Sequence, residues 1–160
     1  MDTQKIGRTK RAKMTFASFG SVSTGTLLTD DLAESFLWEL KHYHHPKYKA
    51  LQAEWDRIGE TENDEEREEL ESEFVNEDLT DVMSDLCKPY MYFGTLEGDG
   101  ADFGFWLDWG SLQESDALRV SDLSEVPTGY TGEVIHVNDH GNTSLYSCVR
   151  GRLREIWAVV

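Results

Sequence analysis

The residues with the clearest chemical potential in this chain are the acidic side chains between Asp64 and Asp85. This stretch of 22 residues holds 11 Asp or Glu and one Arg, a net charge of −10. If it is helical, it spans about 33 Å and carries one net charge per roughly 3.3 Å. Phosphates along one DNA strand are about 3.4 Å apart, so the stretch could present charge to a protein that binds nucleic acid. A solvated surface helix is the simpler alternative.

We predict that nine of these acids form a contact surface for a basic partner. The whole chain has a formal net charge of −16. This charge disfavours direct binding to nucleic acid or to an anionic membrane, and it favours basic partners such as nucleic-acid-binding proteins. The nine predicted contact residues are Glu65, Glu66, Glu68, Glu69, Glu71, Glu73, Glu77, Asp78 and Asp81.

Two other groups contain residue types that bind metals. Residues 98–102 place two aspartates beside two glycines, but a Ca²⁺ loop needs six or more oxygen ligands, usually in a denser acidic pattern. His42, His44 and His45 lie close together, yet no cysteine and no HExxH spacing accompanies them. We therefore expect a β-turn in the first case and a helix end in the second, with no metal and no other cofactor.

A catalytic set is not expected either. Cys148, His136 and Asp139 could supply a nucleophile, a base and an orienting acid, but any chain with five histidines and many acids permits such a choice. The glycines at residues 98–100 are not followed by the Lys-Ser/Thr pair of a phosphate-binding loop. The sequence therefore predicts a protein that is not an enzyme.

Two helices are predicted before the acidic stretch. The first is capped by Thr29 and ends near His44 and His45, because Pro46 cannot continue a helix and restricts the residue before it. The second starts at Pro46 and ends at Gly59. It has an apolar face made of Tyr48, Leu51, Trp55 and Ile58.

A third helix is predicted to carry the acidic stretch. Asn63 can cap it, with Glu66 at the position that completes a capping box, and it should run to about Leu86. One face can dock on a core because apolar residues recur at nearly helical spacing, namely at Leu70, Phe74, Leu79, Val82, Met83 and Leu86. Repulsion between acids costs roughly 0.2–0.5 kcal/mol per i,i+4 pair, so tertiary packing must compensate.

After Pro89 the hydrophobic period changes to two, which indicates strands. Turn-forming residues separate six candidate strands, at residues 90–95, 103–109, 118–120, 133–138, 143–149 and 153–160. Short loops between consecutive strands predict an antiparallel meander. The expected fold is α+β, with about three N-terminal helices packed on a C-terminal antiparallel β-meander sheet in one domain over residues 14–160.

The first 13 residues differ from the rest of the chain. They contain five bases and one acid, a net charge of +4, and almost nothing apolar. We expect a basic disordered leader, or an upstream start before Met14, and a functional basic arm is the alternative. Since the sequence has no signal-peptide core and no apolar run near the roughly 20 residues that span a bilayer, the expected location is the cytoplasm. Cys87 and Cys148 are expected to be reduced thiols.

The run at residues 90–106 reads Tyr-Met-Tyr-Phe-Gly-Thr-Leu-Glu-Gly-Asp-Gly-Ala-Asp-Phe-Gly-Phe-Trp. It resembles a run in small acidic proteins encoded by bacteriophage genomes. Phe-Gly-Ser at residues 19–21, Gly-Thr-Leu at 25–27 and Val-Asn-Asp-His-Gly-Asn at 137–142 are similar to the same family. The resemblance covers roughly residues 16–160 and implies a phage-encoded protein in a bacterial host cell. The family has no assigned activity, so it transfers no site residues.

Together these observations predict a phage-type acidic protein that inhibits a host nucleic-acid-binding defence complex by DNA mimicry. Anti-CRISPR or antirestriction activity would fit, and the partner would be a basic host protein or nucleoprotein complex. The alternative is a non-catalytic structural or interaction module, as a monomer or a homo-oligomer, in which the acidic helix only faces solvent.

Overall fold

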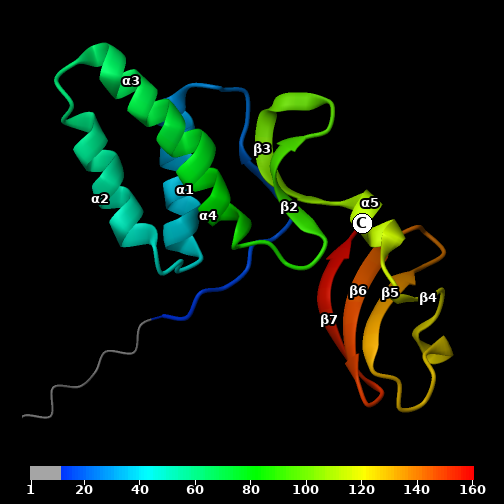
Figure 1. The fold of residues 1–160 in the computed structure, drawn as a ribbon. Coiled ribbons are helices and arrows are strands. Elements are labelled where there is room, and N and C mark those ends of the chain that lie inside the picture. The colour runs from blue at the N-terminus through cyan, green and yellow to red at the C-terminus, as the bar shows by residue number, and fades with distance from the viewer. Residues whose placement is uncertain (1–11) are drawn as a thin grey trace, which may run out of the picture. The chain divides into compact units, whose positions relative to one another are not determined.

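Helices fill the first part of the chain and strands fill most of the rest, which confirms the α+β class (Figure 1). The computed structural model describes residues 12–160, so residues 1–11 of the predicted leader lie outside the described residues. The described chain forms two compact units. The helical unit comprises residues 12–16 and Thr26–Leu86, and the sheet unit comprises Ala17–Gly25 and Cys87–Val160. The grouping of residues 14–160 into one domain stays a prediction.

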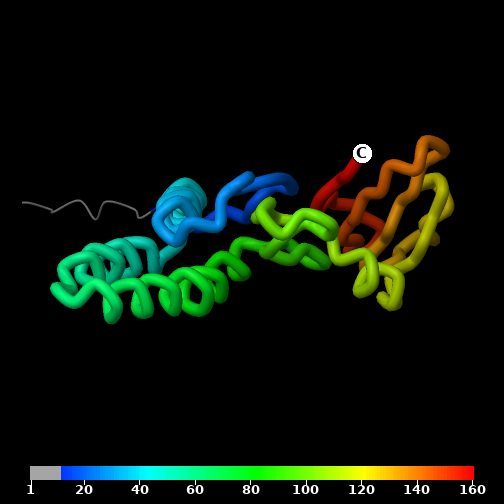
Figure 2. The backbone as a smooth tube through the Cα atoms, turned by 90° about the horizontal axis from the view of Figure 1, so that it is seen from above, coloured from blue at the N-terminus to red at the C-terminus, as the bar shows by residue number. Residues whose placement is uncertain are grey.

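The helical unit consists of two separate helices and one composite helix. The elements are α1 (Thr29–His42), α2 (Tyr48–Gly59), α3 (Asp64–Glu73), the π-helical segment η1 (Phe74–Leu79) and α4 (Thr80–Ser84). Figure 2 shows that the tube runs from α3 through η1 into α4 as one uninterrupted coil. In the described chain, no helix is both long and apolar enough to cross a bilayer.

The predicted helix ends hold to within three residues, but one cap and one helix start differ. Asn63 caps α3 as predicted, because its side-chain oxygen accepts a hydrogen bond from the Glu66 backbone N–H at 2.9 Å. Thr29 is the first residue of α1 rather than its cap, and Leu28, which has no side-chain acceptor, takes the cap position. Pro46 lies in the link before α2, which begins two residues later.

A buried histidine fixes the link between α1 and α2. His45 is 6% exposed. Its Nδ1 accepts a hydrogen bond from the Lys47 backbone N–H at 3.0 Å, so in the neutral ring the proton sits on Nε2. That nitrogen donates to Asp85 Oδ2 at 3.0 Å. The link is thereby tied to the residue that follows α4.

The sheet unit contains two sheets, where the sequence predicted a single meander. One has the order β1-β3-β2 and the other the order β4-β5-β6-β7. Their strands are β1 (Gly20–Ser23), β2 (Met91–Leu96), β3 (Asp99–Leu107), β4 (Leu118–Val120), β5 (Gly132–Val137), β6 (Thr143–Val149) and β7 (Arg152–Val159). The short helices α5 (Trp109–Glu114) and η2 (Leu123–Glu125) complete the unit.

Two long connections account for the difference from a simple meander. β1 comes from before the helices, yet it pairs antiparallel with β3. β4 pairs parallel with β5, because residues 121–131, which include η2, are long enough to return the chain to the same end of the sheet. The remaining neighbours pair antiparallel, as the hairpin turns predicted.

One glycine makes the β1–β3 pairing possible. A Cβ atom on Gly104 would lie 2.3 Å from the Gly20 carbonyl oxygen and 2.7 Å from the Trp106 ring. Only a residue without a side chain therefore fits between β1 and that indole. The Trp106 Nε1–H then donates to the Gly94 carbonyl oxygen at 3.0 Å, which ties β3 to β2.

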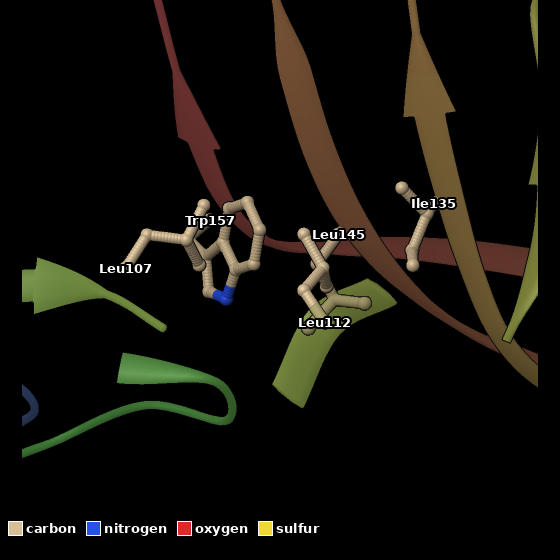
Figure 3. Packing of buried hydrophobic residues seen from close by; sticks show 5 residues of the cluster. All are labelled: Leu107, Leu112, Ile135, Leu145 and Trp157. Carbon is tan, nitrogen blue, oxygen red and sulfur yellow. The ribbon is translucent and has the colours of Figure 1, made fainter. Parts of the chain in front are cut away.

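The core of the four-stranded sheet surrounds a tryptophan. Trp157 is 4% exposed and packs edge-on against Phe19, with ring centroids 5.5 Å apart. Its Nε1–H donates to the Pro89 carbonyl oxygen at 2.8 Å, so the only polar atom of the indole is satisfied. Figure 3 shows Trp157 with its buried neighbours, which are Leu107, Leu112, Ile135 and Leu145.

Candidate partner-binding surface and the neighbouring groove

The predicted contact residues lie on the composite helix α3–η1–α4. Eight of the nine are exposed. The exception is Glu71, which is half-buried because it points toward α1 and α2. We call the other eight the acidic face: Glu65, Glu66, Glu68, Glu69, Glu73, Glu77, Asp78 and Asp81.

On α3, the acidic face forms one continuous arc. At 100° per residue, the five exposed glutamates from Glu65 to Glu73 cover about 160° of the helix circumference. The opposite side carries Leu70 and Phe74, which are half-buried and buried. Charge is therefore presented over nearly half of the cylinder, and the other half packs.

The π-helical segment determines the direction of Asp81, the last residue of the acidic face. In an uninterrupted α-helix, Asp81 would follow Phe74 by seven residues and lie within about 20° of it, on the buried side. A π-turn accommodates one extra residue and turns everything after it back by about 100°. Leu79 and Val82 are accordingly buried, and Asp81 is exposed with the acids of α3.

A side-chain hydrogen bond lies within this turn. The Thr80 hydroxyl donates to the Val75 carbonyl oxygen, five residues earlier, at 2.9 Å. The π-turn was not predicted from the sequence. Val75 is apolar and lies four residues before Leu79, so the apolar spacing stays compatible with a strict α-helix and gives no sign of the extra residue.

The acidic face has little positive charge near it. Within the described residues, none of its eight carboxylates forms an ion pair. Arg67, the one base of the stretch, instead contacts Asp64 Oδ1 at 2.7 Å and donates to the Thr61 carbonyl oxygen at 3.1 Å. Within α3, two like-charge i,i+4 pairs, Glu65–Glu69 and Glu69–Glu73, each cost about 0.2–0.5 kcal/mol.

An open groove of about 760 Å³ adjoins Glu71 in the same unit. Two helix faces with identical spacing form its walls. One wall holds Asp30, Glu34, Leu37, Trp38 and Lys41 of α1, and the other holds Tyr48, Gln52, Trp55, Asp56 and Gly59 of α2. Both sets step by four, three, one and three residues, which is one face of an α-helix.

The groove combines aromatic rings with acidic groups. Trp38 is 58% exposed and stacks on His42, with centroids 4.9 Å apart. Lys41 Nζ lies 6.0 Å from the centre of the Tyr48 ring, so one cation already occupies an aromatic face there. Trp55 stacks on the buried Phe74 at 5.7 Å, which connects the groove to the core of the unit.

Negative charge dominates the groove. It is lined by five carboxylates, those of Asp30, Glu34, Asp56, Glu60 and Glu71, and by one amine. Burial raises the pKa of Glu71, the nearby charges of Asp30 and Glu68 raise it further, and Arg67 lowers it. Within the described chain, Asp30, Glu34, Asp56 and Glu60 form no ion pair.

The structure places the candidate metal ligands apart. Residues 98–102 form the turn and start of the β2–β3 hairpin, where Asp99 Oδ1 accepts a hydrogen bond from the Ala101 backbone N–H at 3.1 Å. His42 stacks on Trp38, whereas His45 is bound to Asp85. Over residues 12–160, no group of three or more His, Cys, Asp or Glu could hold a metal ion.

The candidate catalytic residues are also apart. His136 pairs with Ser144 on β6, four residues from Cys148, which corresponds to about 13 Å along the strand. Its Nε2 lies 3.1 Å from the Ser121 carbonyl oxygen. Cys148 is 1% exposed, and its thiol donates to the Tyr130 carbonyl oxygen at 3.2 Å. This arrangement does not bring a base to the thiol.

Comparisons with family models, with curated proteins and with solved structures found no match to the chain. The case for a function therefore rests on the residues described above. The resemblance to phage-encoded acidic proteins stays a prediction.

Proposed function

We propose that this chain is a non-enzymatic, phage-type protein that inhibits a host nucleic-acid-binding defence complex by mimicking DNA. The acidic face of α3–η1–α4 would occupy the basic surface on which the complex normally binds phosphates. An anti-CRISPR or antirestriction role in the cytoplasm of a bacterial host fits this proposal. No cofactor is needed, because the inhibitor acts by charge and shape alone.

The observation that supports the proposal is that all eight side chains of the acidic face are exposed. Eight carboxylates point to solvent along α3, η1 and α4, and the π-turn keeps Asp81 among them. Arginine and lysine side chains that bind phosphates also bind carboxylates through charge-assisted hydrogen bonds, so the same partner surface can accept either.

The test is competition with DNA for a purified candidate effector. We expect the full chain to displace a fluorescent duplex. Its direct affinity for the effector, measured without DNA, should fall at least about 10-fold when the salt is raised from about 50 to about 200 mM. The variant Glu65→Gln/Glu68→Gln/Glu69→Gln should lose most of the effect. The matched control Glu97→Gln/Glu114→Gln/Glu125→Gln removes equal charge from exposed positions of the sheet unit and should retain it.

Two results would contradict the proposal. A direct affinity for the effector that does not respond to salt would exclude an electrostatic mechanism. Equal losses in the two triple variants would show that total charge matters, and that the acidic face has no special role.

A second candidate is a non-catalytic interaction module that self-associates. Leu27 and Leu28, just before α1, are 65% and 69% exposed, and neighbouring exposed leucines favour contact with another surface. Light scattering of the full chain distinguishes the two functions. A stable oligomer that persists at high salt and is lost on Leu27→Ser/Leu28→Ser would favour this second candidate.

A further inference from the structure

The groove between α1 and α2 has a chemistry that the acidic face lacks. The acidic face offers carboxylates on a convex helix, whereas the groove sets carboxylates beside the exposed Trp38 and the half-buried Tyr48 in a concave site. Trp38 and Tyr48 offer rings, and Asp30, Glu34 and Asp56 offer acceptors. An arginine side chain uses both features, since its planar guanidinium stacks on rings and donates to carboxylates.

The dimensions of the groove suit a short stretch of polypeptide. Its walls run from Asp30 to Lys41 on α1 and from Tyr48 to Gly59 on α2, which is about 17 Å at 1.5 Å per residue. An extended chain of about five residues covers that length.

We propose that this groove binds an arginine-rich segment of a partner polypeptide. Guanidinium groups would stack on Trp38 and Tyr48 and donate hydrogen bonds to Glu34, Asp56 and the carboxylates beside them. The argument is charge complementarity, because five carboxylates and one amine line the groove and four of those carboxylates have no basic partner in the described chain.

Lys41 already places a cation over an aromatic ring of the groove, which shows how an arginine of such a segment would be held. Lys41 Nζ lies over the Tyr48 ring at 6.0 Å, so an arginine of the partner would extend an arrangement already present. An acidic or purely apolar segment would leave the carboxylates without partners, which disfavours both. The proposal rests on the proposed function in one respect, namely that the partner is basic.

The probe is a five-residue peptide, Arg-Ala-Arg-Ala-Arg, acetylated, amidated and fluorescently labelled, and titrated with the full chain. The matching peptide with glutamine in place of arginine is the negative control. We expect Glu34→Gln/Asp56→Asn to weaken binding about 10-fold and Trp38→Ala to weaken it about 3-fold. Trp38 is exposed, so its substitution leaves the buried residues of the unit in place.

The control variant is Glu68→Gln/Glu69→Gln, which removes the same charge from the acidic face outside the groove. Its binding should change less than 2-fold. Equal weakening in the two double variants, or no effect of Trp38→Ala, would overturn the proposal.

Two segments of this chain could compete with a partner for the groove. One is the basic run at residues 5–13, and the other is the exposed Arg150, Arg152 and Arg154 around the β6–β7 turn. Glutamine substitution of the bases in either segment should leave peptide affinity unchanged. Tighter peptide binding after either change would show that the chain or a second copy fills the groove, and would overturn assignment of the groove to a partner.

The proposed function and this inference can fail separately. If groove variants lose the peptide while the full chain never displaces DNA from any effector, the inference stands and the proposed function fails. If acidic-face variants lose DNA displacement while groove variants keep both activities, the function stands and the inference fails.

Discussion

The helical unit and the sheet unit differ in how their polar groups are used. Residues 26–86 of the helical unit contain 19 acids and five bases, a net charge of −14, whereas the sheet unit contains 11 acids and five bases, a net charge of −6. In the helical unit most acids face solvent without a base. In the sheet unit polar side chains mainly hold backbone: Arg119, for example, donates to the carbonyl oxygens of Leu112, Gln113 and Ser115.

Because of this difference, we expect the two units to respond to different conditions. Repulsion among exposed charges is screened by salt, so the helical unit should become more stable as ionic strength rises. The hydrogen bond from the buried Trp157 indole to the Pro89 carbonyl oxygen is screened much less.

The π-turn sets which residues of the composite helix α3–η1–α4 face the buried side. Inserting one alanine after Asn76 should rotate Leu79 and Val82 by about 100° out of the buried side, at a cost of about 3 kcal/mol or more, similar to losing buried leucines. Deleting Asn76 should instead convert the π-turn to an α-turn and keep both buried sides aligned. Stability of that deletion should stay within about 1 kcal/mol. Urea unfolding followed by circular dichroism measures both, and a deletion as damaging as the insertion would contradict our account of the turn.

The matching test in the sheet unit is Gly104→Ala. The added Cβ would collide with the Gly20 carbonyl oxygen, so we expect a loss of about 3 kcal/mol or more. The control is Gly94→Ala, whose Cβ would meet nothing closer than 3.6 Å. Salt should not rescue Gly104→Ala, because the cause is steric. Recovery of the stability of this variant at high salt would contradict the steric explanation and the predicted difference between the two units.

A hydrogen bond between two side chains makes the sheet unit sensitive to alkaline pH. The Tyr90 hydroxyl donates to Glu133 Oε1 at 2.7 Å, and this bond, followed by burial, raises the pKa of Tyr90. A raised folded pKa means that the stabilisation is complete below the ordinary value of 10.0 and is lost as the pH rises through the folded value. Tyr90→Phe should cost about 1 kcal/mol at neutral pH and much less at strongly alkaline pH. A pH-independent difference would contradict this.

The smallest expected effect is a gain, and it lies in the helical unit. Burial and the charge of Asp30 raise the pKa of Glu71, so its ionised form opposes folding at neutral pH. Glu71→Gln should therefore stabilise the protein at pH 7 by about 0.5 kcal/mol, the size of one or two like-charge contacts. The gain should vanish below the ordinary glutamate pKa of 4.5, where the wild-type side chain is also neutral. Thermal unfolding at both pH values measures this, with Glu69→Gln as the exposed control.

The sequence predicted what local chemistry determines. The cap at Asn63 and the end of α2 at Gly59 depend on neighbouring residues, so they were found. The α+β class followed from the change of period after Pro89. Eight of the nine predicted contact residues are exposed, and their role in binding a partner stays a prediction.

What the sequence did not show depends on distant parts of the chain. Nothing local indicates that Gly20–Ser23 pairs with β3, or that β4 and β5 run parallel. Tyr48 and Trp55 were assigned to an apolar face, yet they line a groove because α1 lies across from them. The residues of the groove were present in the pattern, but only the tertiary arrangement of the helices sets them around one site.

The thiol of Cys148 has a practical consequence for the comparison between the units. It is buried in the four-stranded sheet and bound to the Tyr130 carbonyl oxygen, so an alkylating reagent can reach it only when the sheet opens. The rate at which Cys148 is alkylated in the native protein therefore measures how often the sheet unit opens. The helical unit, which contains no cysteine, can unfold without changing that rate directly. Alkylation of Cys148 thus reports on the sheet unit separately from the helical unit.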